Sequence, residues 1–404
     1  MNNVGINKIA VFSECYSHNL GDGVIFDSIS FLLSNFGIEA VPIDLSGRES
    51  CSASMVQEID ASLFTFVRNV MRVPIRRYGT LRKLCSTSKW YLYDMQKTHD
   101  RWSHIIKSVD AVIIGGGQLL TDIDFGFPPK IFKVAKLAQY YKKPLCILGC
   151  GVGSTGWSLV ARNIYDYVLR RAEYISVRDE DSLNMIRNRL PSSVKVNLHP
   201  DVAFMINQFQ NYSLNLSDNK VVGFNFQPLL NFKKFLPSFN SLSNDTYLNL
   251  WVRLIQGACV AGYRPVIVTN GHPLDYETAR SVVDRLNASG FQVVLADRPL
   301  SSEALIRQLA DLPNLLCTRM HAGIISYCLG NKVIPISWDP KVVGVWSNVG
   351  LEDLVVSAED LFIREWNYFE NIFDNFVHSP KILECAQKKI LSAMSDCVQI
   401  LKKS

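Results

Sequence analysis

Residues 315–341 read LLCTRMHAGIISYCLGNKVIPISWDPK, and the order of residue types in this stretch indicates the fold of the chain. The apolar run 315–317 stops at Thr318, a segment rich in small residues occupies 322–330, and a second apolar run covers 333–336. We interpret this order as strand, loop, helix, strand and loop. A helix between two apolar strands is the repeating unit of a parallel sheet covered by helices.

Arg319 and His321 lie in the loop between the first of these strands and the helix. Ligands of open α/β sheets bind beyond the carboxyl ends of the strands, where a helix N-terminus offers free N–H groups to an anion. The guanidinium of Arg319 fits a carboxylate or a phosphate, and the imidazole of His321 is cationic or neutral near pH 7. The pattern therefore predicts an anion-binding site. An ion-paired arginine beside a helix-capping histidine would produce the same local sequence.

The composition indicates a globular cytoplasmic protein with more than one core. At 404 residues the chain is long enough for two domains, and 48% hydrophobic with 20% charged residues is ordinary for a globular protein. No apolar run reaches the roughly 18 residues of a membrane span, and the N-terminus lacks the pattern of a signal peptide. The ten cysteines contain no CxxC pair, which favours reduced thiols in the cytoplasm.

The net charge of +5 is mild but unevenly distributed. Residues 61–93 contain no acidic residue, and their basic side chains alternate with apolar and aromatic ones. Such a segment can lie on the anionic inner face of the cell membrane, or meet a phosphorylated substrate or a nucleic acid. A solvated helix face over a domain core has the same composition. Among these partners we favour the membrane surface and expect no nucleic acid.

Apolar strand patterns alternate with helical patterns along two parts of the chain. The expected strands are 8–13, 39–44, 111–114, 143–148, 174–177 and 194–198 in the first part, and 221–226, 265–268, 291–296, 315–317 and 333–336 in the second. The polar stretch 207–219 interrupts this alternation and is the best candidate for a linker. Alternating strands and helices predict βαβ units and mostly parallel sheets.

We therefore predict an α/β fold of two Rossmann-like lobes whose parallel sheets face a central cleft, a GT-B-like architecture. The N-terminal lobe is expected to cover residues 1–208, with 46–108 as a mostly helical basic insertion. The C-terminal lobe is expected to cover 220–380 and to carry the Arg319–His321 pair. An amphipathic helix at 381–404 is expected to close the chain.

Two features of the N-terminal lobe lie where strands end. Gly115-Gly116-Gly117 follows an apolar strand, and glycines there either bring the backbone close to a ligand or simply form a tight turn. Asn19 and Asp22 lie at the first strand–helix turn. Asn19 can hold a sugar hydroxyl or cap the helix, and Asp22 can cap the helix or act as a base.

Arg178 ends the strand 174–177 and is a second candidate cation for the cleft. An ion pair with Asp179 or Asp181 is the alternative interpretation. The sequence contains no P-loop or HExxH motif, and the lone pair Asp122-x-Asp124 has no further ligands near it in the sequence. We therefore expect neither a cofactor nor a metal ion.

Together these motifs resemble those of the polysaccharide pyruvyl transferase family, from about residue 8 to 360. The motifs are Asn19-x-Gly21-Asp22, Ile113–Gly117, Gly149–Gly153, Ser176-Val177-Arg178-Asp179-x-x-Ser182, Arg319-x-His321-Ala322 and Asp339-Pro340-Lys341. The resemblance implies transfer of a pyruvyl group from phosphoenolpyruvate to two hydroxyls of a free or lipid-linked sugar acceptor, which gives a ketal. The region 46–108 is the least similar to the family and is expected on the acceptor side.

The resemblance also implies roles for individual residues. Arg178, Arg319 and His321 would bind phosphoenolpyruvate, with Lys341 on the same rim. As a hypothesis of our own about the mechanism, His321 carries a proton or holds the departing phosphate, and Asp22 activates a hydroxyl. The acceptor and loop contacts are expected from Asn19, Gly21, Gly116 and Gly117.

Two other functions are compatible with the sequence. A GT-B glycosyltransferase would use the Arg319–His321 pair to hold the pyrophosphate of a nucleotide sugar. A non-catalytic subunit of a polysaccharide-assembly complex would be expected to lack the arginine and histidine set, which this sequence retains.

Overall fold

The computed structural model describes residues 5–50, 95–123, 125–153, 156–210 and 219–404. The chain divides into two compact units. Unit 1 comprises Met1–Ser17, Ile25–Val202 and Lys388–Ser404, and unit 2 comprises His18–Val24 and Ala203–Gln387. The lobes expected from the sequence differ from these units in three places. The short segment 18–24 belongs to unit 2, unit 1 ends at Val202 instead of at 208, and the C-terminal helix is divided between the units at residue 387.

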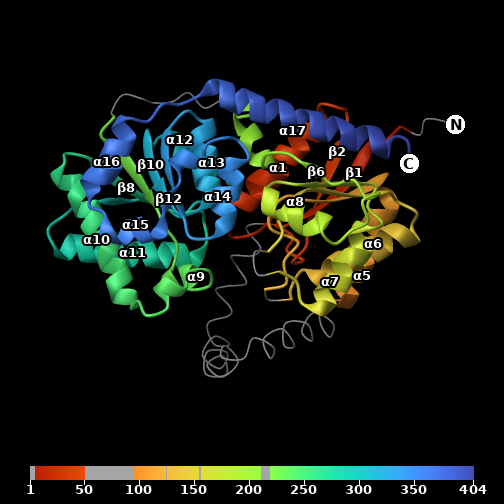
Figure 1. Cartoon of the computed structure of the whole chain (residues 1–404), viewed down its shortest axis with the longest axis horizontal. Helices are drawn as coiled ribbons and strands as arrows, with labels where there is room; N and C mark the ends of the chain where they lie inside the picture. Colours follow the sequence, from red (N-terminus) through yellow and green to blue (C-terminus); the bar gives the residue numbers. More distant parts are fainter. Residues whose placement is uncertain (1–4, 51–94, 124, 154–155, 211–218) are drawn as a thin grey trace. The chain divides into compact units, whose positions relative to one another are not determined.

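Unit 1 contains a parallel sheet, of which Figure 1 labels β1, β2 and β6. Its strand order is β2-β1-β3-β4-β5-β6. Its strands are β1 (Lys8–Ser13), β2 (Glu39–Asp44), β3 (Ala111–Gly115), β4 (Leu145–Cys150), β5 (Tyr174–Val177) and β6 (Asn197–Leu198). The helices between them are α1 (Gly21–Ser34), α5 (Met95–Ser108), α6 (Pro128–Tyr140), α7 (Leu159–Leu169) and α8 (Glu180–Arg187). The last helix of the chain is α17 (Pro380–Leu401).

Unit 2 contains a second parallel sheet with the order β12-β11-β10-β7-β8-β9. Its strands are β7 (Val221–Asn225), β8 (Arg264–Val268), β9 (Val294–Leu295), β10 (Asn314–Cys317), β11 (Lys332–Ser337) and β12 (Val356–Ser357). The helices are α9 (Leu229–Phe232), α10 (Asn244–Val260), α11 (Pro273–Ala288), α12 (Ser302–Ala310), α13 (Met320–Cys328), α14 (Pro340–Ser347), α15 (Ala358–Ile363) and α16 (Trp366–Asp374). Short 3₁₀ segments are η2 (Val202–Gln208), η3 (Pro237–Phe239) and η4 (Glu352–Leu354).

The prediction of an α/β fold with two parallel-sheet lobes is therefore confirmed. The longer elements match the sequence prediction within a few residues because their apolar patterns are long. The sequence did not predict α9, α14, α15 and α16 or the 3₁₀ segments. Strand β4 also continues through Gly149 and Cys150, where a turn was expected. Gly149 has φ +60° and lies within an irregularity of the β4–β5 register, which lets the strand continue through the glycine.

Each sheet has a point where the strand order reverses direction. In unit 1 this point lies between β1 and β3, and in unit 2 it lies between β7 and β10. The two connections that leave such a point run to opposite sides, so a crevice opens at the carboxyl ends of the two strands. The unit 2 crevice receives the residues that follow β7 and β10, and these include Arg319 and His321.

The basic segment 61–93 and most of the insertion 46–108 lie outside the described residues. The proposed contact of that segment with an anionic membrane therefore stays a prediction. In the part of the chain that the structure describes, no helix combines the length and the apolar character that crossing a bilayer would require.

Gly116 shows how a glycine-rich turn positions α1 in unit 1. It has φ +73°, and a Cβ atom added there would lie 1.9 Å from Ile25 Cγ2. The neighbouring Gly117 carbonyl accepts a hydrogen bond from the N–H of Gly151 at 2.8 Å. The two glycine-rich loops that follow β3 and β4 thus pair with each other, as expected for a tight structural turn.

We predict that Gly116→Ala destabilises unit 1 by roughly 2–5 kcal/mol, because it adds a steric clash to the strain of a left-handed residue. Gly37→Ala is a matched control, since Gly37 has φ +71° and no atom within 4 Å of its added Cβ. The control should lose only about 1–2 kcal/mol of stability, because it introduces backbone strain without a steric clash. Urea unfolding of the two variants measures the difference, and equal losses would contradict the steric argument.

Candidate functional site

The candidate site lies at the reversal point of the unit 2 sheet. Cys317 at the end of β10 is in register with Asn225 at the end of β7. The N–H of Thr318 donates to the Asn225 carbonyl at 2.8 Å, and the N–H of Arg319 donates to Asn225 Oδ1 at 3.3 Å. Asn225 therefore extends the strand pairing by two residues and fixes the backbone from which Arg319 and His321 project.

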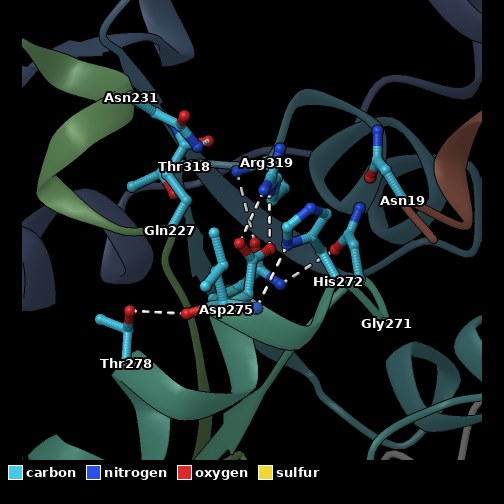
Figure 2. Close-up of polar contacts among 12 residues, drawn as sticks. Asn19, Gln227, Asn231, Gly271, His272, Asp275, Thr278, Thr318 and Arg319 are labelled. Atoms are coloured by element: carbon cyan, nitrogen blue, oxygen red, sulfur yellow. Dashed lines mark hydrogen bonds and ion pairs between the residues drawn. The ribbon is translucent and has the colours of Figure 1, made fainter. Parts of the chain in front are cut away.

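Arg319 is held by a two-point ion pair with Asp275, which lies in the first turn of α11 (Figure 2). Arg319 Nε donates to Asp275 Oδ2 at 2.8 Å and Nη2 donates to Oδ1 at 2.6 Å. The Asp275 carboxylate is fully buried, while the Arg319 side chain is 15% exposed. Nη1 makes no hydrogen bond to a described residue, so this nitrogen can reach a ligand while the ion pair stays intact.

The ion pair also sets the electrostatics of the site. Burial lowers the pKa of Arg319, but the charges of Asp275 and Asp22 and the hydrogen bonds from Asp275 together raise this pKa above its ordinary value. Arg319 is therefore permanently cationic, and its charge is largely offset by the two carboxylates. The alternative of an ion-paired arginine is correct, with Asp275 as the partner, and it leaves one edge of the guanidinium for an anion.

His321 lies in the first turn of α13, whose N-cap residue is Arg319. No side chain of a described residue caps this N-terminus, so the first N–H groups of the helix are directed at the crevice. His321 is 6% exposed and is not the N-cap residue. A capping histidine does occur at α11, where His272 Nδ1 accepts a hydrogen bond from the N–H of Leu274 at 3.2 Å.

Gly21 packs directly against the imidazole of His321. A Cβ atom added to Gly21 would lie 2.6 Å from His321 Cβ and 2.7 Å from Nδ1. Only glycine fits this position without moving the histidine. Two sequence motifs that are 300 residues apart, Asn19-x-Gly21-Asp22 and Arg319-x-His321, therefore meet in unit 2.

The segment His18–Val24 is held on unit 2 by the loop that follows β8. The N–H of Leu20 donates to the carbonyl of Asn270 at 2.9 Å. Gly271 has φ +90°, and a Cβ atom there would lie 2.8 Å from Leu20 Cδ1 and 3.0 Å from the His18 carbonyl. This close backbone contact explains why the segment groups with unit 2.

Asn19 and Asp22 reach the site on this segment. Asn19 Nδ2 donates to Asp22 Oδ2 at 3.2 Å, and the charge of Asp22 acts on the pKa of Arg319. Asp22 is partly exposed, so its carboxylate is accessible as well as close to the cation. The arrangement suits a group that accepts a proton from a hydroxyl.

Lys341 lies in the first turn of α14, after the adjacent strand β11. Its Nζ is 3.2 Å from Asp339 Oδ2 and 5.0 Å from the centre of the Trp338 ring. Asp339 also caps α14, because its Oδ1 accepts a hydrogen bond from the N–H of Lys341 at 3.1 Å. The indole N–H of Trp338 donates to the Thr318 carbonyl at 2.6 Å, which connects this loop to the start of α13.

Arg178 belongs to unit 1 and is 2% exposed. Its Nη1 donates to Asp201 Oδ2 at 2.7 Å, and a Cβ atom at Gly151 would lie 3.1 Å from its Nε. Neither Asp179 nor Asp181 is the partner that the structure shows. The reason is that Asp179 Oδ1 accepts from the N–H of Ser182 at 2.8 Å and so caps α8.

Sequence reasoning did not identify Asp275, Asn225, Gln227 or Asn270. Asp275 follows Pro273 in the first turn of a helix, where an acidic residue is normally explained by the helix dipole. The other three residues are neutral amides that follow strands. Their only signal was polarity at a strand end, which is also the signal of an ordinary loop.

Comparison with known proteins agrees with this geometry. A family model for polysaccharide pyruvyl transferases matches residues 19–340. The amylovoran biosynthesis protein AmsJ of Erwinia amylovora is 24% identical over 349 residues, which cover 83% of this chain and 78% of that protein. The match to the family model begins in the segment that contacts His321 and ends at the first residue of α14.

Solved structures show the same fold at low sequence identity. The UDP-GlcNAc 2-epimerase of Methanocaldococcus jannaschii has a TM-score of 0.53 at 11% identity, with 98% of this chain and 99% of that chain covered. The UDP-N-acetylglucosamine 2-epimerase of Rickettsia bellii also has a TM-score of 0.53, at 10% identity, with 98% and 96% covered. These similarities confirm the GT-B-like architecture. Since the family model matches residues 19–340, which is well over half of the chain and includes Arg319 and His321, this chain belongs to the polysaccharide pyruvyl transferase family.

Proposed function

We propose that the protein transfers a pyruvyl group from phosphoenolpyruvate onto two hydroxyls of a sugar residue, forming a cyclic ketal in polysaccharide biosynthesis. The observation that carries the proposal is the position of Arg319 and His321 at the uncapped N-terminus of α13. Phosphoenolpyruvate has a carboxylate and a phosphate, and this position offers N–H donors, a guanidinium edge and an imidazole to such an anion.

The proposed reaction begins with protonation of the terminal vinyl carbon of phosphoenolpyruvate. Its second carbon then becomes oxocarbenium-like, and one sugar hydroxyl attacks that carbon and loses its proton. The C–O bond to the phosphate breaks, and the second hydroxyl attacks the same carbon and loses its proton. The products are the ketal and inorganic phosphate. Of the two protons released by the hydroxyls, one replaces the proton added to the vinyl carbon and the other protonates the departing phosphate.

Each residue of the unit 2 site has a task in this reaction. Arg319 and the N–H groups of α13 hold the anion. His321 delivers the first proton or stabilises the leaving phosphate. Asp22 accepts a proton from an attacking hydroxyl. Lys341 joins the donor-binding set through its place in a family motif, although it is ion-paired with Asp339. Arg178 belongs to unit 1 and is proposed as a donor-binding residue on its family motif alone.

We predict that Arg319→Lys and His321→Ala each lower the rate of phosphate release by at least about 100-fold. Lysine keeps the charge but cannot make the two-point contact with Asp275 and still reach a ligand. Phosphate release is measured with phosphoenolpyruvate and a panel of sugars that carry 1,2- or 1,3-diols. Arg307→Ala is the control, because Arg307 is exposed on α12 and forms an ion pair with Glu303 on the same helix.

The competing functions give different results in the same experiments. A nucleotide-sugar transferase would be stabilised against heat by a nucleoside diphosphate and not by phosphoenolpyruvate. A non-catalytic subunit would release no phosphate with any acceptor. Full activity of His321→Ala would overturn the role of His321.

The contact of Gly21 with His321 gives a separate prediction. Gly21→Ala should reduce activity by about 10-fold or more, because its methyl group displaces the imidazole. Gly21 does not have a positive φ, so backbone strain does not contribute. In a double-mutant cycle, the stability lost on Gly21→Ala should shrink in the His321→Gly background. Additive stability losses would contradict the contact.

A further inference from the structure

Four buried polar side chains at the carboxyl edge of the unit 2 sheet have an atom that no described residue satisfies with a hydrogen bond. These atoms are Gln227 Nε2, Thr269 Oγ1, Asn270 Nδ2 and Thr318 Oγ1, and each of the four residues is at most 2% exposed. They follow β7, β8 and β10, which are the central strands around the reversal point. Because a buried donor without an acceptor is costly, their grouping indicates a place for ligand oxygen atoms.

Gln227 is fixed with one end of its amide unpaired. The backbone carbonyl of Gln227 accepts a hydrogen bond from Tyr247 Oη. In the side-chain amide, Oε1 accepts a hydrogen bond from Asn231 Nδ2 at 3.1 Å. A 180° rotation of the amide would exchange the atom that meets Asn231 and leave the other atom unpaired. Asn231 is partly exposed, so it is the member of the pair that meets solvent.

Thr318 is fixed in the same way on the other side of the reversal point. Its N–H donates to the Asn225 carbonyl, and its carbonyl accepts from the Trp338 indole N–H. Only its hydroxyl is unsatisfied among the described residues. Figure 2 shows Gln227, Asn231 and Thr318 beside Arg319, at the edge from which α13 begins.

We propose that Gln227 and Thr318 form a neutral hydrogen-bonding subsite for carboxylate or phosphate oxygens of the anionic donor substrate. The inference rests on the proposed function and extends it to two residues outside the motifs that carried the family resemblance. The subsite has a physical purpose, because Asp275 and Asp22 offset the charge of Arg319. A polyanion at this position therefore needs donors other than Arg319, and buried neutral donors bind more strongly than exposed ones.

The test uses the full chain and the near-isosteric variants Gln227→Met and Thr318→Val. Isothermal titration with phosphoenolpyruvate should give affinities about 10- to 100-fold weaker than those of the unchanged protein, as expected for lost hydrogen bonds to a charged group. Both substitutions remove an unsatisfied buried polar atom. Gln227→Met also removes the Oε1 acceptor of Asn231, but Asn231 is partly exposed and can bond to water instead, so neither variant should lower the melting temperature appreciably. Titrations with inorganic phosphate and with pyruvate identify which end of the donor each residue meets.

Ser326→Ala is the matched control. Ser326 is also buried, and its hydroxyl has no partner within the described part of unit 2, but it lies in the body of α13. Its loss should leave the affinity unchanged. If the unchanged protein binds phosphoenolpyruvate and both isosteric variants bind it equally well, the subsite is wrong and the proposed function stands. If the unchanged protein does not bind phosphoenolpyruvate, the proposed function fails and the subsite fails with it.

Discussion

The site in unit 2 depends on the ion pair between Arg319 and Asp275. A guanidinium at the end of a strand could adopt many orientations, but two hydrogen bonds to one buried carboxylate leave it a single plane. Asp275 is itself fixed in the first turn of α11. The pair thereby joins the loop that follows β8 to the loop that follows β10, and the two loops frame the crevice on either side of β7.

The same pair explains why the site contains so many neutral polar groups. A buried cation beside one carboxylate, with a second carboxylate nearby, has little charge left for a ligand. Amides and backbone N–H groups then supply hydrogen bonds without the desolvation cost of further ions. Asn225 illustrates this principle, because its side chain accepts from the N–H of Arg319 and donates to the Val268 carbonyl and to Asn270 Oδ1. One neutral residue thus connects three loops.

Steric constraints complete the arrangement. Gly21 and Gly271 both lie where any side chain would collide with a neighbour, and both collisions involve the segment His18–Val24 or His321. The absence of a side chain at these two positions allows the segment to approach α13. The two glycines therefore allow Asp22 to lie near Arg319, where the opposite charges attract.

The sequence by itself determined the fold class and the long strands and helices, and it identified Arg319 and His321 as candidate site residues. Apolar periodicity and strand-end polarity are local properties, so they are visible in the chain. The sequence did not determine that Asp275 is the partner of Arg319, that Asp201 is the partner of Arg178, or that Gly21 contacts His321. These pairs are separated by 23 to 300 residues. Only the tertiary structure decided them, because the strand order in each sheet selects which loops meet at its carboxyl edge.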